Sequence, residues 1–222
     1  MSPGQKQSTL KMVWYASYGS NLKRERFMYY IKGGAPVEST SARPYLGCRN
    51  KSEPMESRPI SLNYELYFSG RSRTWGNGGV AFIRENQSRG PTLGRIYLIT
   101  DEQFNDLVMQ ENSKTPDGSR VVPPFEQLVS QQEWRLCNSF WYGKLLNIGW
   151  EGFYPILTFT TTRTDLQRPT APSEQYVKVI ASGIKETHPE IGDADIVAYL
   201  SRADGIHGTI GLPQIRAWVA AA

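Results

Sequence analysis

Residues 12–34 are MVWYASYGSNLKRERFMYYIKGG, and this stretch decides how the fold begins. Its first seven residues, 12–18, are aromatic or favour β-structure, which predicts a strand. Gly19 and Ser20 interrupt that pattern. The residues over 21–32 then fit a helix, and the glycine pair that follows them is typical of a helix end. The stretch therefore predicts a strand, a tight turn and a helix in succession.

The turn itself, Tyr18-Gly19-Ser20-Asn21-Leu22, is the first candidate site. The first N–H groups of a helix have no partner within the helix, and the helix dipole favours negative charge beside them. Gly19 lets a ligand approach the backbone closely, and Ser20 and Asn21 suit both ligand binding and helix capping. The turn therefore has two possible interpretations. It is a cradle that binds a carboxylate or an oxyanion, or it is simply a capped helix.

Glu111 is the second candidate. Thr100 and Gln103 have the spacing of a capping box, so we expect a helix over 101–111, DEQFNDLVMQE. Its apolar face is formed by Phe104, Leu107 and Val108. Glu111 falls on that same face, where burial would raise the pKa of its carboxyl toward the range that a general acid/base needs. Because Glu111 lies in the last turn, its side chain could also bend back to solvent.

The rest of the chain predicts further strands and helices in mixed order. Alternating or β-favouring residues indicate strands over 60–68, 78–83, 93–99, 134–148 and 155–162. Ser173 is expected to cap an amphipathic helix, and shorter helices are expected over 193–200 and 213–221. The predicted fold class is therefore α+β. We expect a flexible leader over 1–11 and a single domain over 12–222, with an insertion at about 112–150 and C-terminal helices at about 189–222.

Composition excludes several classes of function. The 222 residues carry a net charge of +4 in short basic clusters, which fits a solvated surface better than a nucleic-acid groove. No apolar run approaches the roughly 20 residues that cross a bilayer, and the polar N-terminus is unlike a secretory signal. We therefore expect a cytoplasmic protein with no membrane or nucleic-acid partner. Cys48 and Cys137 are expected to be free thiols, and two histidines argue against structural zinc.

Five motifs, in order, resemble the gamma-glutamylcyclotransferase-like family. YGSNL at 18–22 follows an aromatic strand, and the helix over 101–111 ends in Gln110-Glu111. The other three are TWGNGGVA at 74–81, GRIY at 94–97 and PSEQY at 172–176. The resemblance covers residues 13–184, and the layout is similar to that of longer bacterial relatives in this group.

The resemblance implies a small mixed β-barrel with flanking helices and a reaction that needs no metal or cofactor. In that reaction the α-amine of a γ-glutamyl amide or peptide attacks its own γ-carbonyl, which gives 5-oxoproline and a free amine. The small-molecule substrate would be bound through the backbone of Tyr18, Gly19, Ser20, Asn21 and Leu22. By the same resemblance Glu111 would relay the proton, and Trp75 and Tyr176 would line the substrate site.

Two departures from the family pattern concern the pocket. Asn112 stands where a glycine usually follows the glutamate, and Phe159 stands where some members present a tyrosine. The long segment 112–150 leaves the family's tyrosine in that region without an assigned counterpart. Two alternatives therefore stay open: another amide or lactam chemistry on the same scaffold, and a ligand-binding member without catalysis. The substrate, the leaving amine and the oligomeric state are not predicted.

Overall fold

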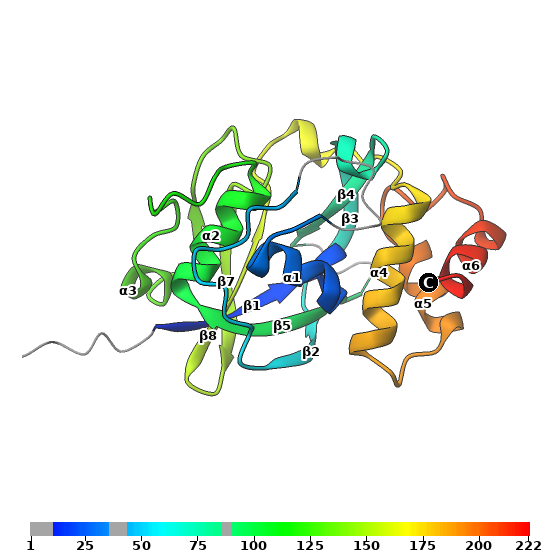
Figure 1. Cartoon of the computed structure of the whole chain (residues 1–222). Coiled ribbons are helices and arrows are strands. Elements are labelled where there is room, and N and C mark those ends of the chain that lie inside the picture. Colours follow the sequence, from blue (N-terminus) through cyan, green and yellow to red (C-terminus); the bar gives the residue numbers. More distant parts are fainter. Residues whose placement is uncertain (1–10, 36–43, 86–89) are drawn as a thin grey trace, which may run out of the picture.

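The computed structural model describes residues 11–35, 44–85 and 90–222, so nearly all of the predicted leader lies outside the described residues. Figure 1 shows strands, helices and long connections arranged around a twisted sheet. The strands are β1 (Met12–Ser17), β2 (Ser57–Leu62), β3 (Glu65–Ser72), β4 (Gly78–Arg84), β5 (Thr92–Thr100), β6 (Glu133–Arg135), β7 (Lys144–Glu151) and β8 (Tyr154–Thr160). The α-helices are α1 (Arg24–Lys32), α2 (Asp101–Glu111), α3 (Phe125–Leu128), α4 (Glu174–Thr187), α5 (Asp193–Ser201) and α6 (Leu212–Ala220). Three short 3-10 helices are η1 (Ser20–Leu22), η2 (Arg73–Trp75) and η3 (Asp165–Gln167).

The main sheet has six strands in the order β2-β5-β1-β8-β7-β6, and β3 pairs with β4 in a second sheet. Within the main sheet β1 is antiparallel to β5 and parallel to β8. The α+β prediction is confirmed. The sheet is not closed into the barrel that the resemblance implied, because in the described chain β2 and β6 remain its two edges. The hydroxyl of Thr160 joins β8 to the second sheet, donating to the Ile83 carbonyl at 2.6 Å.

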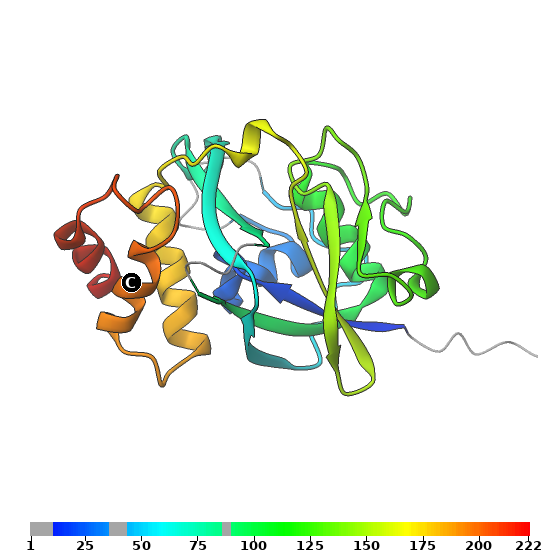
Figure 2. The same cartoon turned by 180° about the vertical axis from the view of Figure 1, so that it is seen from behind.

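β1 is buried along its whole length, which explains why its sequence shows no polar alternation. On one side Trp14 and Ala16 belong to a core cluster with residues of β3, β4, α4, α5 and α6. On the other side Val13 and Tyr15 pack in a second cluster with residues of α1 and α2. The strand that leads into the YGSNL turn is therefore fixed from both faces. Figure 2 shows α4, α5 and α6 gathered at one end of the molecule, beyond the second sheet.

Three predicted elements are divided in the structure. The strand expected over 60–68 is two strands, because the Tyr64 N–H bonds to the Leu62 carbonyl and the chain turns between β2 and β3. The helix expected over 21–32 is split into η1 and α1 by the extended backbone of Lys23. The region 134–148 contains the short β6 and most of β7, separated by a loop. None of the helices in the described ranges is long and apolar enough to cross a bilayer.

The segment at 112–150 packs onto the domain. Its strands β6 and β7 extend the main sheet at one edge. Val122 and Leu128 are buried in the same cluster as α1 and α2. Residues 139–142 turn back toward the YGSNL turn, where they help to line a cavity. This segment therefore contributes to the candidate site.

Gly183 sets the distance between α4 and η1. A Cβ atom there would lie 2.5 Å from the Lys23 backbone nitrogen and 2.6 Å from the Leu22 Cβ. We expect Gly183→Ala to lower the free energy of unfolding by about 1–3 kcal/mol, because overpacking outweighs the better helix propensity of alanine. Urea unfolding would measure the difference, with Ser182→Ala on the same helix as the matched control. Equal stability of Gly183→Ala and the unmodified protein would contradict this packing.

Candidate active site

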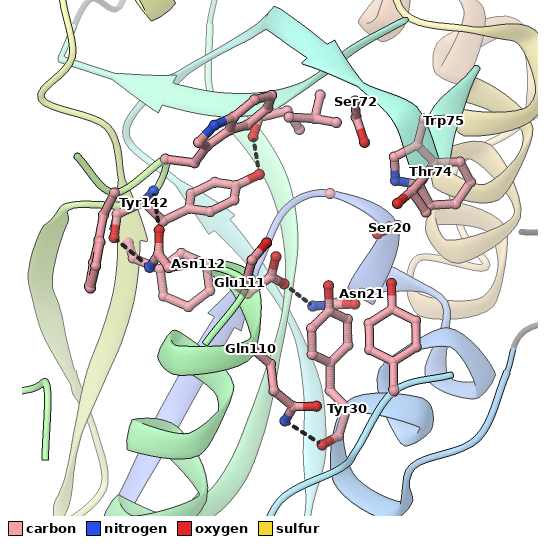
Figure 3. Close-up of a pocket in the computed structure, with 18 of the residues that line it drawn as sticks. Ser20, Asn21, Tyr30, Ser72, Thr74, Trp75, Gln110, Glu111, Asn112 and Tyr142 are labelled. Carbon is pink, nitrogen blue, oxygen red and sulfur yellow. Dashed lines mark hydrogen bonds between the residues drawn. The ribbon is translucent and has the colours of Figure 1, made fainter. Parts of the chain in front are cut away.

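A cavity of about 580 Å³ opens between several parts of the chain. Its lining includes the β1–η1 turn, the end of α2, the region of η2 and the segment 139–142, together with residues 44–46 and residues of α1, β4, β8 and α4. Figure 3 shows Glu111 near the middle of this cavity, between Asn21 on one side and Tyr142 on the other. Of the residues predicted from sequence, Tyr18, Gly19, Ser20, Asn21, Trp75, Glu111 and Tyr176 all line it.

The end of α2 delivers the Glu111 carboxylate to the cavity. The helix begins in the predicted capping box, in which Thr100 Oγ1 accepts from the Gln103 N–H at 3.0 Å and Gln103 Oε1 accepts from the Thr100 N–H at 3.0 Å. Phe104, Leu107 and Val108 are fully buried, as the apolar face required. Glu111 is half-buried and points into the cavity rather than outward.

A side-chain hydrogen bond joins the two predicted sites. The Asn21 amide donates from Nδ2 to Glu111 Oε1 at 3.0 Å (Figure 3). Asn21 is 4 % exposed, and its Oδ1 atom has no hydrogen-bond partner among the described residues. The Nδ2 atom also donates to the Tyr15 hydroxyl at 3.3 Å, so two contacts hold the Asn21 amide in place.

Burial raises the pKa of Glu111 to about 7. Three groups oppose this shift: the charge of Arg26 and the hydrogen bonds from Tyr30 and Asn21 all favour the ionised carboxylate and lower the pKa. A carboxyl that titrates near neutral pH can both accept and return a proton under ordinary conditions. The geometry therefore gives Glu111 the properties of a general acid/base.

Tyr176 and Trp75 form the wall behind the turn. The Tyr176 hydroxyl accepts from the Ala81 N–H at 3.1 Å, and its ring centroid lies 4.7 Å from that of Trp75. A Cβ atom at Gly19 would lie 3.0 Å from the Tyr176 hydroxyl oxygen. Glycine at 19 therefore permits the close approach of the turn to α4. Tyr18 lines the cavity, while its hydroxyl donates to the Phe159 carbonyl at 2.6 Å.

Leu22 corrects the prediction for the YGSNL turn. Its side chain is fully buried in the core and does not line the cavity. Its N–H donates to the Gly19 carbonyl at 3.0 Å, which closes η1, and the Lys23 N–H likewise donates to the Ser20 carbonyl. The Leu22 amide is thus used within the turn. Only the N–H groups that precede it, of Ser20 and Asn21, lack a partner inside η1.

Arg26 is buried next to Tyr30 and Tyr45 of the cavity lining, and the sequence did not predict this arrangement. Arg26 is 1 % exposed and its guanidinium carbon lies 4.6 Å from the Tyr45 ring centroid, 5.3 Å from that of Trp75 and 5.7 Å from that of Tyr30. It donates to the Tyr45 hydroxyl, while Nε and Nη1 have no partner in the described chain. The only sequence signal was the spacing of Arg26 and Tyr30, four residues apart on one helix face.

Asn112 anchors the segment 112–150 to the site. Its Oδ1 accepts from the Tyr142 N–H at 2.9 Å, and its Nδ2 donates to the Tyr142 carbonyl at 3.2 Å. The Tyr142 hydroxyl in turn donates to the Ala81 carbonyl at 3.2 Å. The asparagine that replaces the usual glycine therefore holds a tyrosine of this segment at the cavity. Phe159 lines the cavity as well, with its ring 5.2 Å from that of Tyr142.

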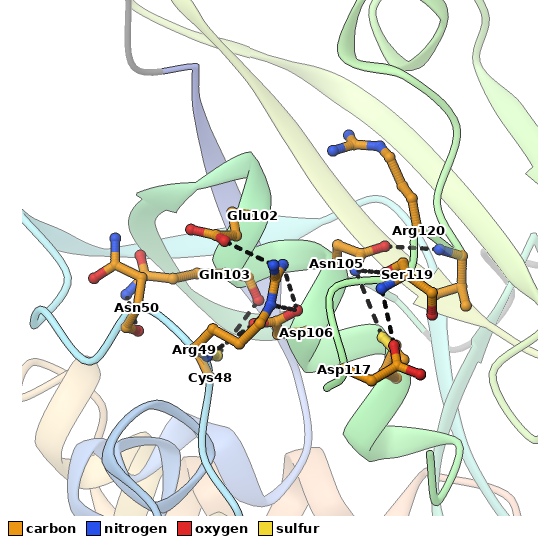
Figure 4. Close-up of polar contacts among 12 residues, drawn as sticks. Cys48, Arg49, Asn50, Glu102, Gln103, Asn105, Asp106, Asp117, Ser119 and Arg120 are labelled. Atoms are coloured by element: carbon orange, nitrogen blue, oxygen red, sulfur yellow. Dashed lines mark hydrogen bonds and ion pairs between the residues drawn. The ribbon is translucent and has the colours of Figure 1, made fainter. Parts of the chain in front are cut away.

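The other side of α2 is fixed by a polar cluster (Figure 4). Asp106 is fully buried and accepts from the Arg49 N–H at 2.9 Å and from the Arg49 guanidinium at 3.1 Å. Gln103 Nε2 donates to the Asn50 and Ser52 carbonyls at 3.2 and 2.8 Å. Both cysteines are free thiols, Cys48 buried next to this cluster and Cys137 exposed. The cluster fixes the helix that carries Glu111 in place.

Comparison with known proteins adds two likenesses. No family model matches the chain. Histone deacetylase 5 of Arabidopsis thaliana is 33% identical over 205 residues, which covers 86% of this chain and 30% of that protein, so the chain spans less than a third of the length of this relative. Among residues 11–35, 44–85 and 90–222, no group of three or more His, Cys, Asp or Glu side chains could hold a metal ion.

The second likeness is structural. A solved gamma-glutamyl cyclotransferase superposes with a TM-score of 0.50 at 16% sequence identity, over 96% of this chain and 100% of that chain. The chain has the gamma-glutamyl cyclotransferase-like fold.

Proposed function

We propose that this chain is an enzyme that cleaves a γ-glutamyl amide or peptide by attack of the substrate's own α-amine, with Glu111 as general acid/base. The products are 5-oxoproline and a free amine. The observation that carries the proposal is the Glu111 carboxylate, whose pKa is raised to about 7 and which Asn21 holds inside a cavity of substrate size. The gamma-glutamyl cyclotransferase-like fold supports it.

The reaction starts with a proton transfer. The ionised Glu111 carboxylate accepts a proton from the α-ammonium of the bound substrate, which frees the nitrogen lone pair. That nitrogen attacks the γ-carbonyl carbon and closes a five-membered ring, while the carbonyl electron pair moves onto oxygen. A positioned general base of this kind contributes about 10²- to 10⁴-fold to the rate.

Asn21 orients the carboxylate in this step. Its Nδ2 donates to Glu111 Oε1 and so holds the carboxylate in the cavity, where the α-amine must lie to reach it. The Asn21 N–H, which has no partner inside η1, is the donor that the turn offers to the developing oxyanion, whereas the Ser20 N–H bonds to the Tyr176 hydroxyl. Donors preorganised in this way are worth about 3–4 kcal/mol in comparable acyl-transfer sites.

The second step releases the amine. Glu111, now protonated, gives its proton to the leaving nitrogen, and the bond between the γ-carbon and that nitrogen breaks as the oxyanion collapses. The ring nitrogen still carries a second proton and a positive charge after the attack, and it loses that proton to the released amine. The products are then a neutral lactam and an ammonium ion, and the carboxylate has returned to its starting state. No metal or cofactor enters this scheme, and the cytoplasmic location and the lack of a nucleic-acid or membrane partner remain predictions from composition.

A second candidate is hydrolysis of an amide by water in the same cavity. The name of the Arabidopsis relative, histone deacetylase 5, refers to removal of an acyl group from an amine, although the match covers only 30% of that protein. In that case water would replace the α-amine as the nucleophile that Glu111 deprotonates. A γ-glutamyl substrate would then yield free glutamate, so the product distinguishes the two reactions.

The proposal predicts the effect of Glu111→Gln. Incubation with a panel of γ-glutamyl amino acids and amines should give 5-oxoproline, measured by mass spectrometry, and Glu111→Gln should lower the rate about 10²- to 10⁴-fold, because the glutamine cannot carry the proton. Glu25→Gln on α1 makes the same change at an exposed carboxylate and should keep full activity. Full activity of Glu111→Gln, or free glutamate as the product, would overturn the proposal.

The raised pKa of Glu111 predicts how stability depends on pH. The folded protein binds the proton more tightly than the unfolded chain, so the free energy of unfolding falls as pH rises from about 4.5 to about 7. Glu111→Gln does not titrate, and its stability relative to the unmodified protein should increase by about 1–3 kcal/mol between pH 5 and pH 8. Urea unfolding at both pH values would measure this. A constant difference would show that the carboxyl is not perturbed.

We expect the pH dependence of the rate to shift when the charge of Arg26 is removed. Removing its charge in Arg26→Met should raise the pKa of Glu111 further, by about half a unit to one unit, because the ionised carboxylate loses a favourable neighbour. The acid limb of the pH–rate profile should move to higher pH by the same amount. Arg26→Lys keeps the charge and should restore most of the original profile. Identical profiles for all three proteins would exclude this electrostatic role.

A further inference from the structure

The charged residues that line the cavity are mostly basic. Arg71, Arg73 and Lys114 are exposed cations at its edge, whereas Glu111 is the acidic residue of the lining. None of the three cations forms an ion pair within residues 11–35, 44–85 and 90–222. Their positive charge is therefore not neutralised by the described protein and acts on whatever enters the mouth of the cavity.

The cations lie on two walls. Arg71 and Arg73 come from the end of β3 and from η2, next to Ser72 and Thr74. Lys114 follows the end of α2, two residues beyond Asn112. Figure 3 shows that Ser72 and Thr74 lie across the cavity from Asn112, with Glu111 between them. By their neighbours in the chain, Arg71 and Arg73 therefore belong to one side of the cavity lining and Lys114 to the other.

The backbone fixes Lys114 at this position. The Lys114 N–H donates to the Met109 carbonyl at 2.8 Å and the Ser113 N–H to the Gln110 carbonyl at 3.0 Å, which is the Schellman arrangement at a helix C-terminus. Ser113 takes the left-handed conformation that this arrangement needs, with φ 57°. The Lys114 ammonium lies 5.9 Å from the centroid of the Phe140 ring, also in the lining. The cation is thus tied to the same helix end as Glu111.

We infer that Arg71, Arg73 and Lys114 select γ-glutamyl substrates whose leaving amino acid has an acidic side chain. The inference rests on the proposed function, which places the γ-glutamyl group beside Glu111 and Asn21. The leaving amino acid then extends to the mouth, where its two carboxylates meet cations on both walls. Arginine binds carboxylates in a bidentate manner, and a basic or neutral leaving group would leave these cations without a counter-charge.

Two dipeptides of the same size test the selection. γ-Glutamyl-glutamate and γ-glutamyl-glutamine differ by one negative charge at the end of the leaving residue. Calorimetric titration of Glu111→Gln, which should turn them over about 10²- to 10⁴-fold more slowly, should show about three- to tenfold tighter binding of γ-glutamyl-glutamate at low salt. The preference should decrease as sodium chloride rises to about 0.5 M, because exposed charges are screened. The unmodified protein should show the same preference in kcat/KM.

Variants that remove one charge each test whether the cations at the mouth cause the preference for γ-glutamyl-glutamate. Arg71→Gln, Arg73→Gln and Lys114→Gln should each bring the ratio of the two affinities closer to one, mainly by weakening γ-glutamyl-glutamate. Arg216→Gln removes an exposed arginine from α6, away from the cavity lining, and should leave the ratio unchanged. An unchanged ratio in all three mouth variants would overturn the assignment.

The outcomes separate this inference from the reaction on which it rests. Equal affinities, tighter binding of γ-glutamyl-glutamine, or no binding of either dipeptide would overturn the selection. Tighter binding of γ-glutamyl-glutamate without any 5-oxoproline from the unmodified protein would support the selection and contradict the proposed reaction. Formation of 5-oxoproline at equal rates from both dipeptides would support the reaction and contradict the selection.

Discussion

The hydrogen bond from Asn21 to Glu111 is the contact around which the site is organised. It joins residues 90 positions apart, at 3.0 Å, between the start of the domain and the end of α2. A carboxylate removed from water needs donors of its own, and this one receives them from Asn21 and Tyr30. If either η1 or α2 moved, the carboxylate would lose a donor and the cavity would lose its inner wall. The geometry of both elements is therefore coupled to the chemistry.

The rest of the fold keeps these two elements in place from behind. Gly183 lets α4 contact η1 without a side chain between them, and Tyr176 of the same helix packs against the turn at Gly19. On the far side of α2, the buried Asp106 binds Arg49 and so anchors the helix to the preceding loop. Because side chains pack closely on both sides, Asn21 and Glu111 stay within hydrogen-bond distance of each other.

Local patterns were enough to predict the elements that carry the site. A capping box and helical spacing placed Glu111 on the apolar face of α2, and an aromatic strand before Gly19 predicted the turn. Contacts made only by tertiary packing were not visible. Arg26 approaches the cavity wall only after α1 packs beside it, and Tyr142 reaches the cavity through Asn112. The resemblance implied that the Leu22 backbone binds substrate, whereas its N–H closes η1 on the Gly19 carbonyl, a contact that the motif does not reveal.

Two sets of charged residues act on the cavity, one buried and one exposed. The buried charge influences the pKa of Glu111, whereas the exposed charges influence which substrate binds. Arg26 is buried, so its interaction with Glu111 is weakly screened and opposes the burial that raises the pKa of the carboxyl. Arg71 and Lys114 are exposed at the mouth, where salt screens them and where they influence binding more than proton transfer. A substitution at the mouth can therefore change which substrate enters while the proton affinity of Glu111 stays as the interior sets it. In a scaffold of this kind, substitutions at the mouth can change the range of substrates between related proteins without disturbing the acid/base group.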